Sequence, residues 1–122
     1  MLTTGVDIIE IARVQKSLER WGAHFIERIF TPAEVASCRG MPHELAVRFA
    51  AKEALSKALG TGIWCDDGVW WDEMEVLPDE RGKPIVHLSG RAQQRAGELG
   101  LTEFALSLSH SDHYAVAFVV AR

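Results

Sequence analysis

The side chains best suited to chemistry are two carboxylates and a lysine that lie in unusually apolar stretches of the chain. Asp7 interrupts a run of β-branched residues, and Glu53 and Lys57 lie one helical turn apart among alanines. Burying a charge is costly unless it is paired, bound to a metal ion or used in a reaction. Two carboxylates from separate elements could share Mg²⁺, and a neighbouring lysine could hold a phosphate as a point charge. Simpler interpretations stay open, namely a solvent-facing Asp7 and an intrahelical Glu53–Lys57 ion pair.

Two further features could serve a phosphate or a nucleophile. His110 ends an apolar strand at a turn, where it is either a hydrogen-bonded turn residue or a phosphate contact. The tripeptide at 60–62, Gly-Thr-Gly, is either an ordinary helix cap or a loop whose backbone can approach a phosphate closely. It is not a Walker loop, because no Gly-Lys-Ser/Thr follows. A Ser/His/Asp hydrolase fails too, because the chain has no Gly-x-Ser-x-Gly elbow.

A long helix predicted from Pro42 to Gly60 must position Glu53 and Lys57. Proline in the first turn and glycine just past the end are typical helix boundaries. Apolar residues cover almost the whole circumference, which indicates that the helix is buried. Arg48 and Lys52 are a second pair of charged residues on it. We therefore expect the rest of the chain to wrap this helix and to supply partners for its charges.

The remaining pattern predicts an α+β domain. The predicted strands are 4–11, 69–77, 84–88, 104–110 and 114–120, and the other predicted helices are 11–21, 23–29 (short or irregular), 32–39 and 90–99. Thr31, with Pro32 and Glu34 after it, is predicted to cap one of these helices. Ser89 is predicted to cap the last helix.

Length and composition suit a single globular domain. The chain has 122 residues, of which 48% are hydrophobic and 25% charged. A net charge of −4 argues against nucleic acid as the main partner. No apolar run is long enough for a membrane span, and no signal peptide is recognised. Two free thiols in a cytoplasmic protein are expected for Cys38 and Cys65, with one disulfide as the alternative.

One helix face is basic. Arg13, Lys16 and Arg20 follow one another at spacings of three and four residues, so they share a face of the helix predicted at 11–21. Such a strip is usually a solvated surface. Its alternative role is to dock an acidic protein partner.

Several ordered motifs resemble the 4′-phosphopantetheinyl transferases, in particular their short, holo-acyl-carrier-protein synthase branch. The signature is Gly5-Val6-Asp7 near the N-terminus, followed by the decapeptide FAAKEALSKA at 49–58. The match continues in the expected order through DIIEIAR at 7–13, FTPAE at 30–34, GTG at 60–62, GKP at 82–84, LSGRA at 88–92 and SLSHS at 107–111. Residues 63–67 and the pair Trp70-Trp71 depart from the family pattern.

The resemblance implies an enzyme that moves the phosphopantetheine arm of coenzyme A onto a serine of an apo acyl carrier protein and releases adenosine 3′,5′-bisphosphate. Asp7 and Glu53 match the family's Mg²⁺ ligands, and Lys57 matches its phosphate-binding lysine. Glu53, or a metal-bound water near it, is the implied base for the serine hydroxyl. The implied coenzyme A contacts are Arg48, Lys52, Gly60, Thr61 and His110. The basic strip of Arg13, Lys16 and Arg20 becomes the implied docking surface, because carrier proteins are acidic where they meet this family.

The resemblance also implies the architecture. It predicts a small antiparallel sheet packed around a long central helix, as one domain over residues 1–122 that assembles into a homotrimer with sites at subunit interfaces. Such an assembly would account for so apolar a helix. Two other functions remain open. One is a carrier-binding module that has lost the chemistry, and the other is a Mg²⁺-dependent hydrolase that cleaves coenzyme A without a carrier.

Overall fold

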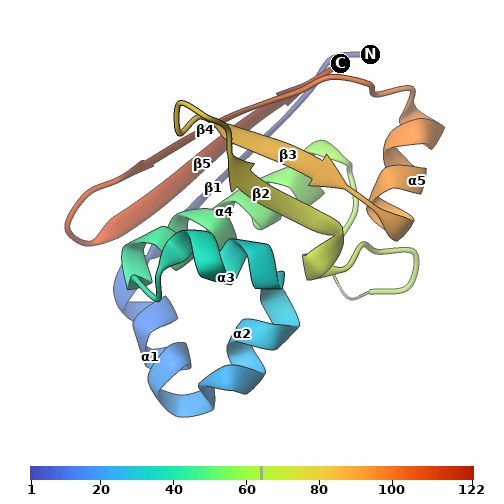
Figure 1. The fold of residues 1–122 in the computed structure, drawn as a ribbon. Coiled ribbons are helices and arrows are strands. Elements are labelled where there is room, and N and C mark those ends of the chain that lie inside the picture. Colours follow the sequence, from blue (N-terminus) through green and yellow to red (C-terminus); the bar gives the residue numbers. More distant parts are fainter. Residues whose placement is uncertain (64) are drawn as a thin grey trace.

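Helix α4 (Pro42–Ala58) runs through the centre of the molecule (Figure 1). The computed structural model describes residues 1–63 and 65–122. Helix α4 begins with Pro42 at its first position and is followed by Leu59 and by Gly60, whose φ of +64° is the left-handed conformation that glycine adopts easily. The predicted helix is therefore confirmed, with glycine just beyond its end.

A three-stranded antiparallel sheet covers one side of helix α4. Its strand order is β1 (Thr3–Glu10), β5 (Tyr114–Ala121) and β4 (Phe104–His110), so that β1 and β4 are the edges. Strands β1 and β5 both pack against the helix, and the two chain termini lie close together at one end of the sheet (Figure 1). The predicted α+β class, with an antiparallel sheet around a central helix, is confirmed.

A hairpin packs against both α4 and the edge strand β4 of this sheet, and it differs from the prediction at its start. Its strands are β2 (Met74–Pro78) and β3 (Pro84–Leu88), and helix α5 (Gly90–Leu99) follows. The strand predicted from Val69 begins only at Met74, because a 3₁₀ turn, η1 (Trp71–Glu73), comes first. Two main-chain carbonyls at this turn point to a buried lysine instead of to a neighbouring strand.

The cap predicted for helix α5 is also different. The Ser89 side chain makes no capping hydrogen bond. The Glu73 carboxylate accepts instead from the main-chain N–H of Arg91 at 2.7 Å and from that of Trp70 at 2.8 Å. A carboxylate satisfies the first N–H groups of a helix and favours its positive end, so a distant acid replaces the local serine.

Three short helices form the remaining end of the molecule (Figure 1). They are α1 (Ile11–Trp21), α2 (Ala23–Ile29) and α3 (Pro32–Cys38). The cap predicted at Thr31 is confirmed: its hydroxyl accepts from the N–H of Glu34 at 3.2 Å, and the Glu34 carboxylate accepts from the N–H of Thr31 at 3.0 Å.

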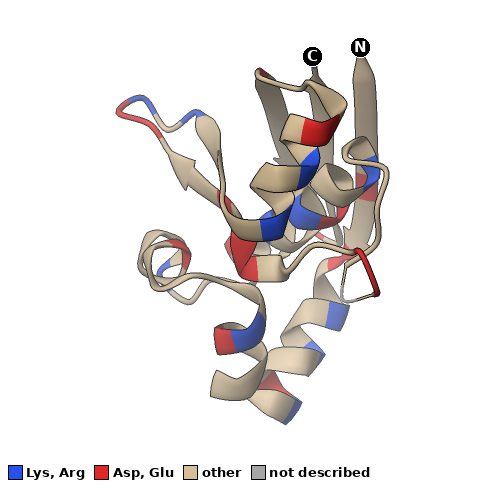
Figure 2. Ribbon diagram, turned by 90° about the vertical axis from the view of Figure 1, so that its right-hand side faces the viewer, with Lys and Arg blue, Asp and Glu red and all other residues tan. Residues whose placement is uncertain are grey.

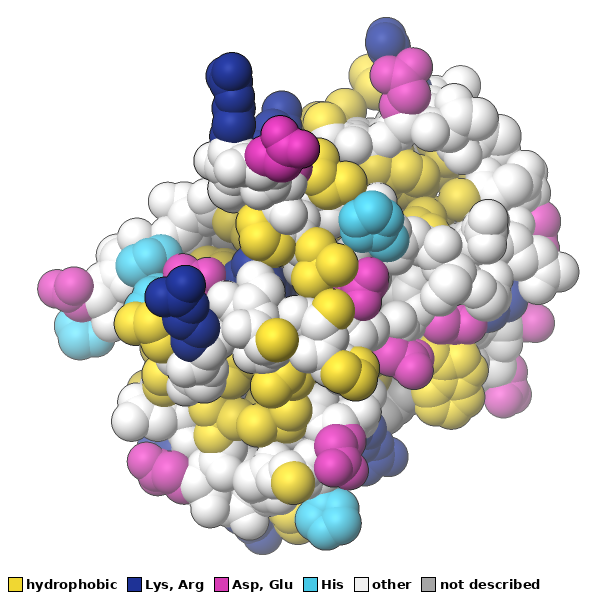
Figure 3. All heavy atoms as spheres, viewed as in Figure 1, with side chains coloured by type: hydrophobic (Ala, Val, Ile, Leu, Met, Phe, Trp, Pro, Cys, Tyr) yellow, Lys and Arg dark blue, Asp and Glu magenta, His cyan; other side chains and the backbone are white. Residues whose placement is uncertain are grey.

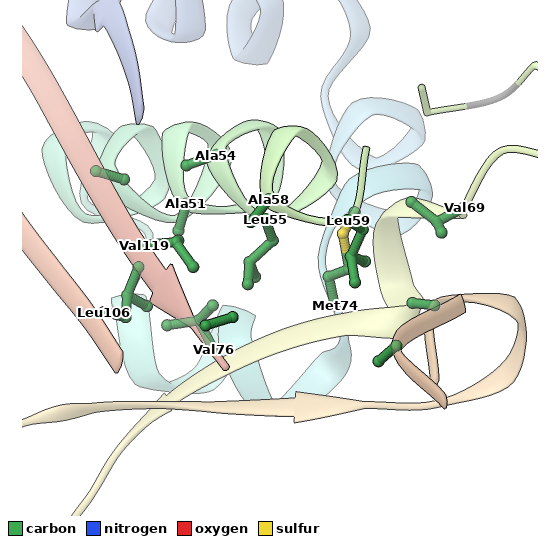
Figure 4. Close-up of a cluster of buried hydrophobic side chains, with 14 of the residues drawn as sticks. Ala51, Ala54, Leu55, Ala58, Leu59, Val69, Met74, Val76, Leu106 and Val119 are labelled. Atoms are coloured by element: carbon green, nitrogen blue, oxygen red, sulfur yellow. The ribbon is translucent and has the colours of Figure 1, made fainter. Parts of the chain in front are cut away.

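Small residues on helix α4 let its neighbours approach closely. Ala51, Ala54 and Ala58 are buried against side chains from the sheet and the hairpin (Figure 4). Gly5 of β1 is also buried, and a Cβ added there would collide with the carbonyl oxygen of Ala54. Strand β1 can therefore lie this close to α4 only because position 5 has no side chain.

A buried ion pair links helix α4 to α3 and to the hairpin. The fully buried Lys52 ammonium donates to the Glu34 carboxylate at 2.7 Å and to the carbonyls of Trp71 and Met74, each at 2.9 Å. The second carboxylate oxygen of Glu34 accepts from the N–H of Val76 at 2.9 Å. Burial lowers the pKa of Lys52, while the negative charge of Glu34 opposes that shift.

Both cysteines are free thiols, as predicted, with Cys38 buried and Cys65 exposed. Burial raises the pKa of Cys38 to about 11, which keeps this thiol protonated and unreactive. Among the described helices, none combines the length and the hydropathy that crossing a membrane requires.

Gly5→Ala tests the close approach of β1 to α4. We expect it to lower the free energy of unfolding by about 1–3 kcal/mol, because the new methyl group meets backbone that cannot move aside easily. Chemical denaturation followed by circular dichroism measures this change.

Gly97→Ala, within helix α5, is the matched control. A Cβ at position 97 meets nothing within 4 Å, so the same substitution should be neutral or stabilise by roughly 0.5–1 kcal/mol. Equal effects at the two positions would contradict the close packing of β1 on α4.

Candidate active site

The three side chains predicted to do chemistry meet at one pocket. A hollow of about 420 Å³ lies between strand β1 and helices α1 and α4, and Asp7, Glu53 and Lys57 all line it. Asp7 comes from the edge strand, whereas the other two come from successive turns of α4. Residues some fifty positions apart in the chain are thus brought together by the packing of β1 on α4.

The orientation of Asp7 follows from the alternation of strand β1. Gly5 and Asp7 turn toward α4, whereas Val6 and Ile8 point outward and are 53% and 65% exposed. This is the reverse of the usual apolar-in, polar-out pattern. The solvent-facing interpretation of Asp7 is therefore wrong, because only 18% of its side chain is exposed.

Lys57 contacts strand β1. Its ammonium lies 3.2 Å from Oδ1 of Asp7 and donates to the main-chain carbonyl of Val6 at 2.8 Å. The hydrogen bonds of the described chain include none between Lys57 and Glu53. The weak intrahelical pair that their spacing allows is therefore not the arrangement that forms.

Burial and the nearby charge of Asp7 both affect the pKa of Glu53. Its pKa is raised, chiefly because burial disfavours the carboxylate and then because Asp7 is negative, while Lys57 acts in the opposite direction. A cation between Asp7 and Glu53 would cancel their mutual repulsion.

The donor set at this pocket fits a hard divalent cation. In the part of the chain that the structure describes, no group of three or more His, Cys, Asp and Glu side chains could hold a metal ion. Asp7 and Glu53 line the same pocket, so together they would provide two carboxylates and leave the other coordination positions to water and substrate. That is how Mg²⁺ is usually bound beside phosphates.

Two of the predicted coenzyme A contacts line a different pocket. Arg48 and His110 border a hollow of about 220 Å³ together with the turn of the β2–β3 hairpin. The Arg48 guanidinium is buried and pairs with the Glu44 carboxylate at 2.9 Å. The His110 ring lies against that of His43, with 4.8 Å between ring centroids. Within one chain, Arg48 and His110 therefore lie at a different pocket from Asp7, Glu53 and Lys57.

The other predicted coenzyme A contacts have different surroundings. Lys52 is enclosed by the ion pair with Glu34 and by two carbonyls, so it presents no exposed atom to a ligand and is omitted from the site. Gly60 is exposed just past α4, and the Thr61 hydroxyl donates to the carbonyl of Asp67 at 3.2 Å. Trp64, in the unusual stretch 63–67, lies outside the described residues.

Aromatic walls are the part of the pocket that sequence reasoning missed. Phe25 and Phe49 line both the carboxylate pocket and an adjoining apolar pocket of about 400 Å³. Trp71 stacks on Phe49 with 4.9 Å between ring centroids, and the centroid of the Phe25 ring lies 6.4 Å from that of Phe49. One signal was available, since Phe49 precedes Glu53 by one helical turn and so projects from the same face of α4.

The basic strip lies on helix α1, at the end of the molecule formed by the short helices, where several Lys and Arg positions are coloured blue (Figure 2). Arg13 lines the carboxylate pocket, and Lys16 and Arg20 are exposed farther along the helix. The Arg20 guanidinium covers the exposed Trp21 ring at 4.7 Å from its centroid. Hydrophobic side chains also reach the surface around these helices (Figure 3). The strip thus begins at the carboxylate pocket and ends at Arg20, over the Trp21 ring that lines the apolar pocket.

Comparisons with known proteins agree along nearly the whole chain. A model of the 4′-phosphopantetheinyl transferase superfamily matches residues 3–119. The holo-[acyl-carrier-protein] synthase of Herpetosiphon aurantiacus is 50% identical, over 98% of both chains.

Solved structures agree with this match. The holo-[acyl-carrier-protein] synthase of Helicobacter pylori, in complex with coenzyme A, has a TM-score of 0.87 at 29% identity, covering 98% of this chain and 99% of that chain. The Chronobacterium ammoniagenes ACPS–coenzyme A complex has a TM-score of 0.86 at 34% identity, covering 100% and 97%. The resemblance seen in the ordered motifs is therefore confirmed, and the chain belongs to the 4′-phosphopantetheinyl transferase superfamily.

Proposed function

We propose that this protein transfers the 4′-phosphopantetheine arm of coenzyme A to a serine of an apo acyl carrier protein and releases adenosine 3′,5′-bisphosphate. The observation that carries the proposal is the convergence of Asp7, Glu53 and Lys57 at one pocket. Support comes from a relative of half identity named holo-[acyl-carrier-protein] synthase and from two structural neighbours in complex with coenzyme A.

Each of the three side chains has a separate task in this reaction. Asp7 and Glu53 would hold Mg²⁺, which supplies neutralisation of the pyrophosphate charge when bound. Lys57 donates to the phosphate that leaves. The serine oxygen forms a bond to the phosphorus nearest the pantetheine arm while the anhydride bond from that phosphorus breaks. The bond's electron pair leaves with the bisphosphate.

The serine proton needs an acceptor close to the attacking oxygen. Glu53 is the candidate base, either directly or through a water beside it. Phe25 and Phe49 form apolar walls at the same pocket and limit the access of water to the reacting phosphate.

The nucleotide half of coenzyme A requires more surface than this pocket offers. Gly60, which is exposed, and Thr61, which is half-buried, follow the last turn of α4 and are proposed contacts next to the phosphate. Arg48 and His110 lie at their own pocket. We propose that the nucleotide bridges the carboxylate pocket of one subunit and the Arg48–His110 pocket of its neighbour.

The outer face of the three-stranded sheet is the proposed assembly surface. Val6, Ile8, Phe118 and Tyr114 are all between 45% and 65% exposed there, and they lie on adjacent strands in register. An apolar face of this kind marks an interaction site. We propose that it is buried in a homotrimer. The apolar character of α4 has another cause, because its own chain covers it on every side that carries alanine or leucine.

The domain and its location complete the proposal. Residues 1–122 form one phosphopantetheinyl transferase domain. The protein acts in the cytoplasm, where free thiols such as Cys38 and Cys65 stay reduced.

The transfer itself is tested by incubating the protein with coenzyme A, Mg²⁺ and an apo carrier protein, and then weighing the carrier by mass spectrometry. We expect the carrier to gain one phosphopantetheine group. Asp7→Ala and Glu53→Ala should each reduce the rate by a factor on the order of 10² or more while the far-ultraviolet circular dichroism stays unchanged.

The same assay separates the competing functions. Binding to a carrier without any gain in its mass would indicate a module without chemistry. Cleavage of coenzyme A in the absence of carrier would indicate a hydrolase. Either result, obtained with folded protein, would contradict the proposed transfer.

Charge reversal tests the docking role of helix α1. Lys16→Glu combined with Arg20→Glu should raise the KM for the carrier roughly tenfold and leave the KM for coenzyme A nearly unchanged, because exposed charges steer association with an acidic partner. The salt dependence of the rate should weaken as well. Arg122→Glu, at the exposed end of the chain, is the matched control and should leave both KM values unchanged. A carrier KM that does not move in the double variant would exclude the docking strip.

Phe118→Glu tests the assembly surface. A charge at the centre of a buried apolar interface is costly, so the variant should behave as a 13.5 kDa monomer in size-exclusion chromatography with light scattering. The unmodified chain and Phe118→Leu should both show about three times that mass. A monomeric unmodified chain would contradict the homotrimer.

A further inference from the structure

We propose that Lys57 competes with the metal ion for Asp7 in the ligand-free protein and leaves that carboxylate when a phosphate draws its ammonium away, so that this lysine links metal binding to coenzyme A binding. The inference rests on the proposed function, because it needs Asp7 as a metal ligand and Lys57 as a phosphate contact. It adds that binding of coenzyme A and binding of the metal ion at that site depend on each other.

The first observation is where the ammonium lies. The Nζ atom of Lys57 is 3.2 Å from Oδ1 of Asp7 and 2.8 Å from the carbonyl oxygen of Val6. In the part of the chain that the structure describes, Lys57 is the one cationic side chain in an ion pair with Asp7. A carboxylate with 18% of its surface exposed is thus neutralised by the protein's own cation before any metal arrives.

The position of β1 in the sheet explains why the lysine is held there. Strand β1 is an edge, so alternate main-chain carbonyls along it have no partner in strand β5. The carbonyl of Val6 takes the lysine as its donor. One ammonium therefore satisfies both an edge carbonyl and the neighbouring carboxylate, which are contributed by consecutive residues of the same strand.

The second observation is that the lysine is free to leave. The Lys57 side chain is 53% exposed, and its long aliphatic stem emerges from the last turn of α4. An exposed ion pair is worth about 1 kcal/mol at most. A bound phosphate offers the ammonium a stronger acceptor than the carboxylate that it leaves. When Lys57 moves away, water can solvate the carbonyl of Val6, because the hydrogen bond that joins them is exposed.

Electrostatics make the two occupants of Asp7 mutually exclusive. A divalent ion bound to Asp7 would lie only a few ångströms from the ammonium if Lys57 stayed in place, and like charges at that separation repel strongly. Metal binding without a phosphate must therefore displace the Lys57 ammonium from Asp7 into water. The free energy that this displacement costs weakens metal binding.

The linkage works in both directions. If a phosphate strengthens metal binding by removing Lys57 from Asp7, the metal strengthens phosphate binding by the same factor. The free protein would then bind the metal weakly and assemble the complete site only when coenzyme A is present. Lys57→Met removes the competitor while preserving most of the aliphatic stem, and so isolates this effect.

The test measures Mn²⁺ affinity by electron paramagnetic resonance or calorimetry, first without any nucleotide. We expect Lys57→Met to bind Mn²⁺ about three- to fivefold more tightly than the unmodified protein, which corresponds to the loss of an ion pair worth about 1 kcal/mol at most. Adenosine 3′,5′-bisphosphate should strengthen Mn²⁺ binding by a larger factor in the unmodified protein than in the variant, because only the former has a lysine to relocate.

Arg13→Gln is the matched control for the loss of one positive charge. Arg13 lines the same pocket but forms no ion pair with Asp7. Its substitution should tighten Mn²⁺ binding by about twofold at most. Thermal unfolding of all three proteins, monitored by circular dichroism, verifies that each one is folded.

Two results would overturn the proposal, and they differ from each other. If Lys57→Met binds Mn²⁺ no more tightly than Arg13→Gln, Lys57 does not compete for Asp7, although the proposed transfer can still stand. If none of the folded proteins binds Mn²⁺ even with adenosine 3′,5′-bisphosphate, the metal site of the proposed function fails, and the linkage fails with it.

Discussion

The close approach of strand β1 to helix α4 is the constraint on which the site depends. Gly5 allows it, because any side chain at that position would meet the Ala54 carbonyl. Two residues further along the same face of the strand, Asp7 then lies beside Glu53 and Lys57. One missing side chain thus sets the separation of a carboxylate and a lysine that are fifty positions apart in the chain. The site is therefore carried by two regular elements and the alanines between them, and such elements hold side chains more firmly than loops do.

Helix α4 divides its charges between structure and chemistry. On the hairpin side, Lys52 is fully buried and satisfied by Glu34 and two main-chain carbonyls, which fixes the turn before β2. On the β1 side, Glu53 and Lys57 keep contact with a pocket. Lys52 is thus buried and the adjacent Glu53 lines a pocket, because successive residues project about 100° apart around the helix. The same turn before β2 carries Trp71, whose ring stacks on Phe49 in the wall of the pocket, so the buried ion pair also shapes the site.

Much of this was predictable from the sequence. Capping residues and glycines located the helices, and the ordered motifs identified the family and singled out Asp7, Glu53 and Lys57, which the fold brings to one pocket. Four features were not predictable, and each for a physical reason. The prediction of a strand before Met74 was wrong because Lys52, distant in the chain, donates hydrogen bonds to the main-chain carbonyls of the turn. Glu73 replaced Ser89 as the cap because tertiary packing brings it to the helix start. Lys52 was misjudged because its partner Glu34 also belongs to a capping box, and a local role in the sequence conceals a long-range one. The separation of Arg48 and His110 from the carboxylates is a property of the folded surface, and spacing along the chain carries no information about it.

The central claim is that Asp7 and Glu53 bind one metal ion while Lys57 binds the phosphate next to it. A crystal structure of the protein with Mn²⁺ and coenzyme A, with an anomalous difference map at the manganese edge, tests this most directly. The account predicts one anomalous peak about 2.0–2.3 Å from carboxylate oxygens of Asp7 and Glu53, with the Lys57 ammonium on a phosphate oxygen. A metal ion held by other residues, or Lys57 still paired with Asp7 beside bound coenzyme A, would contradict it.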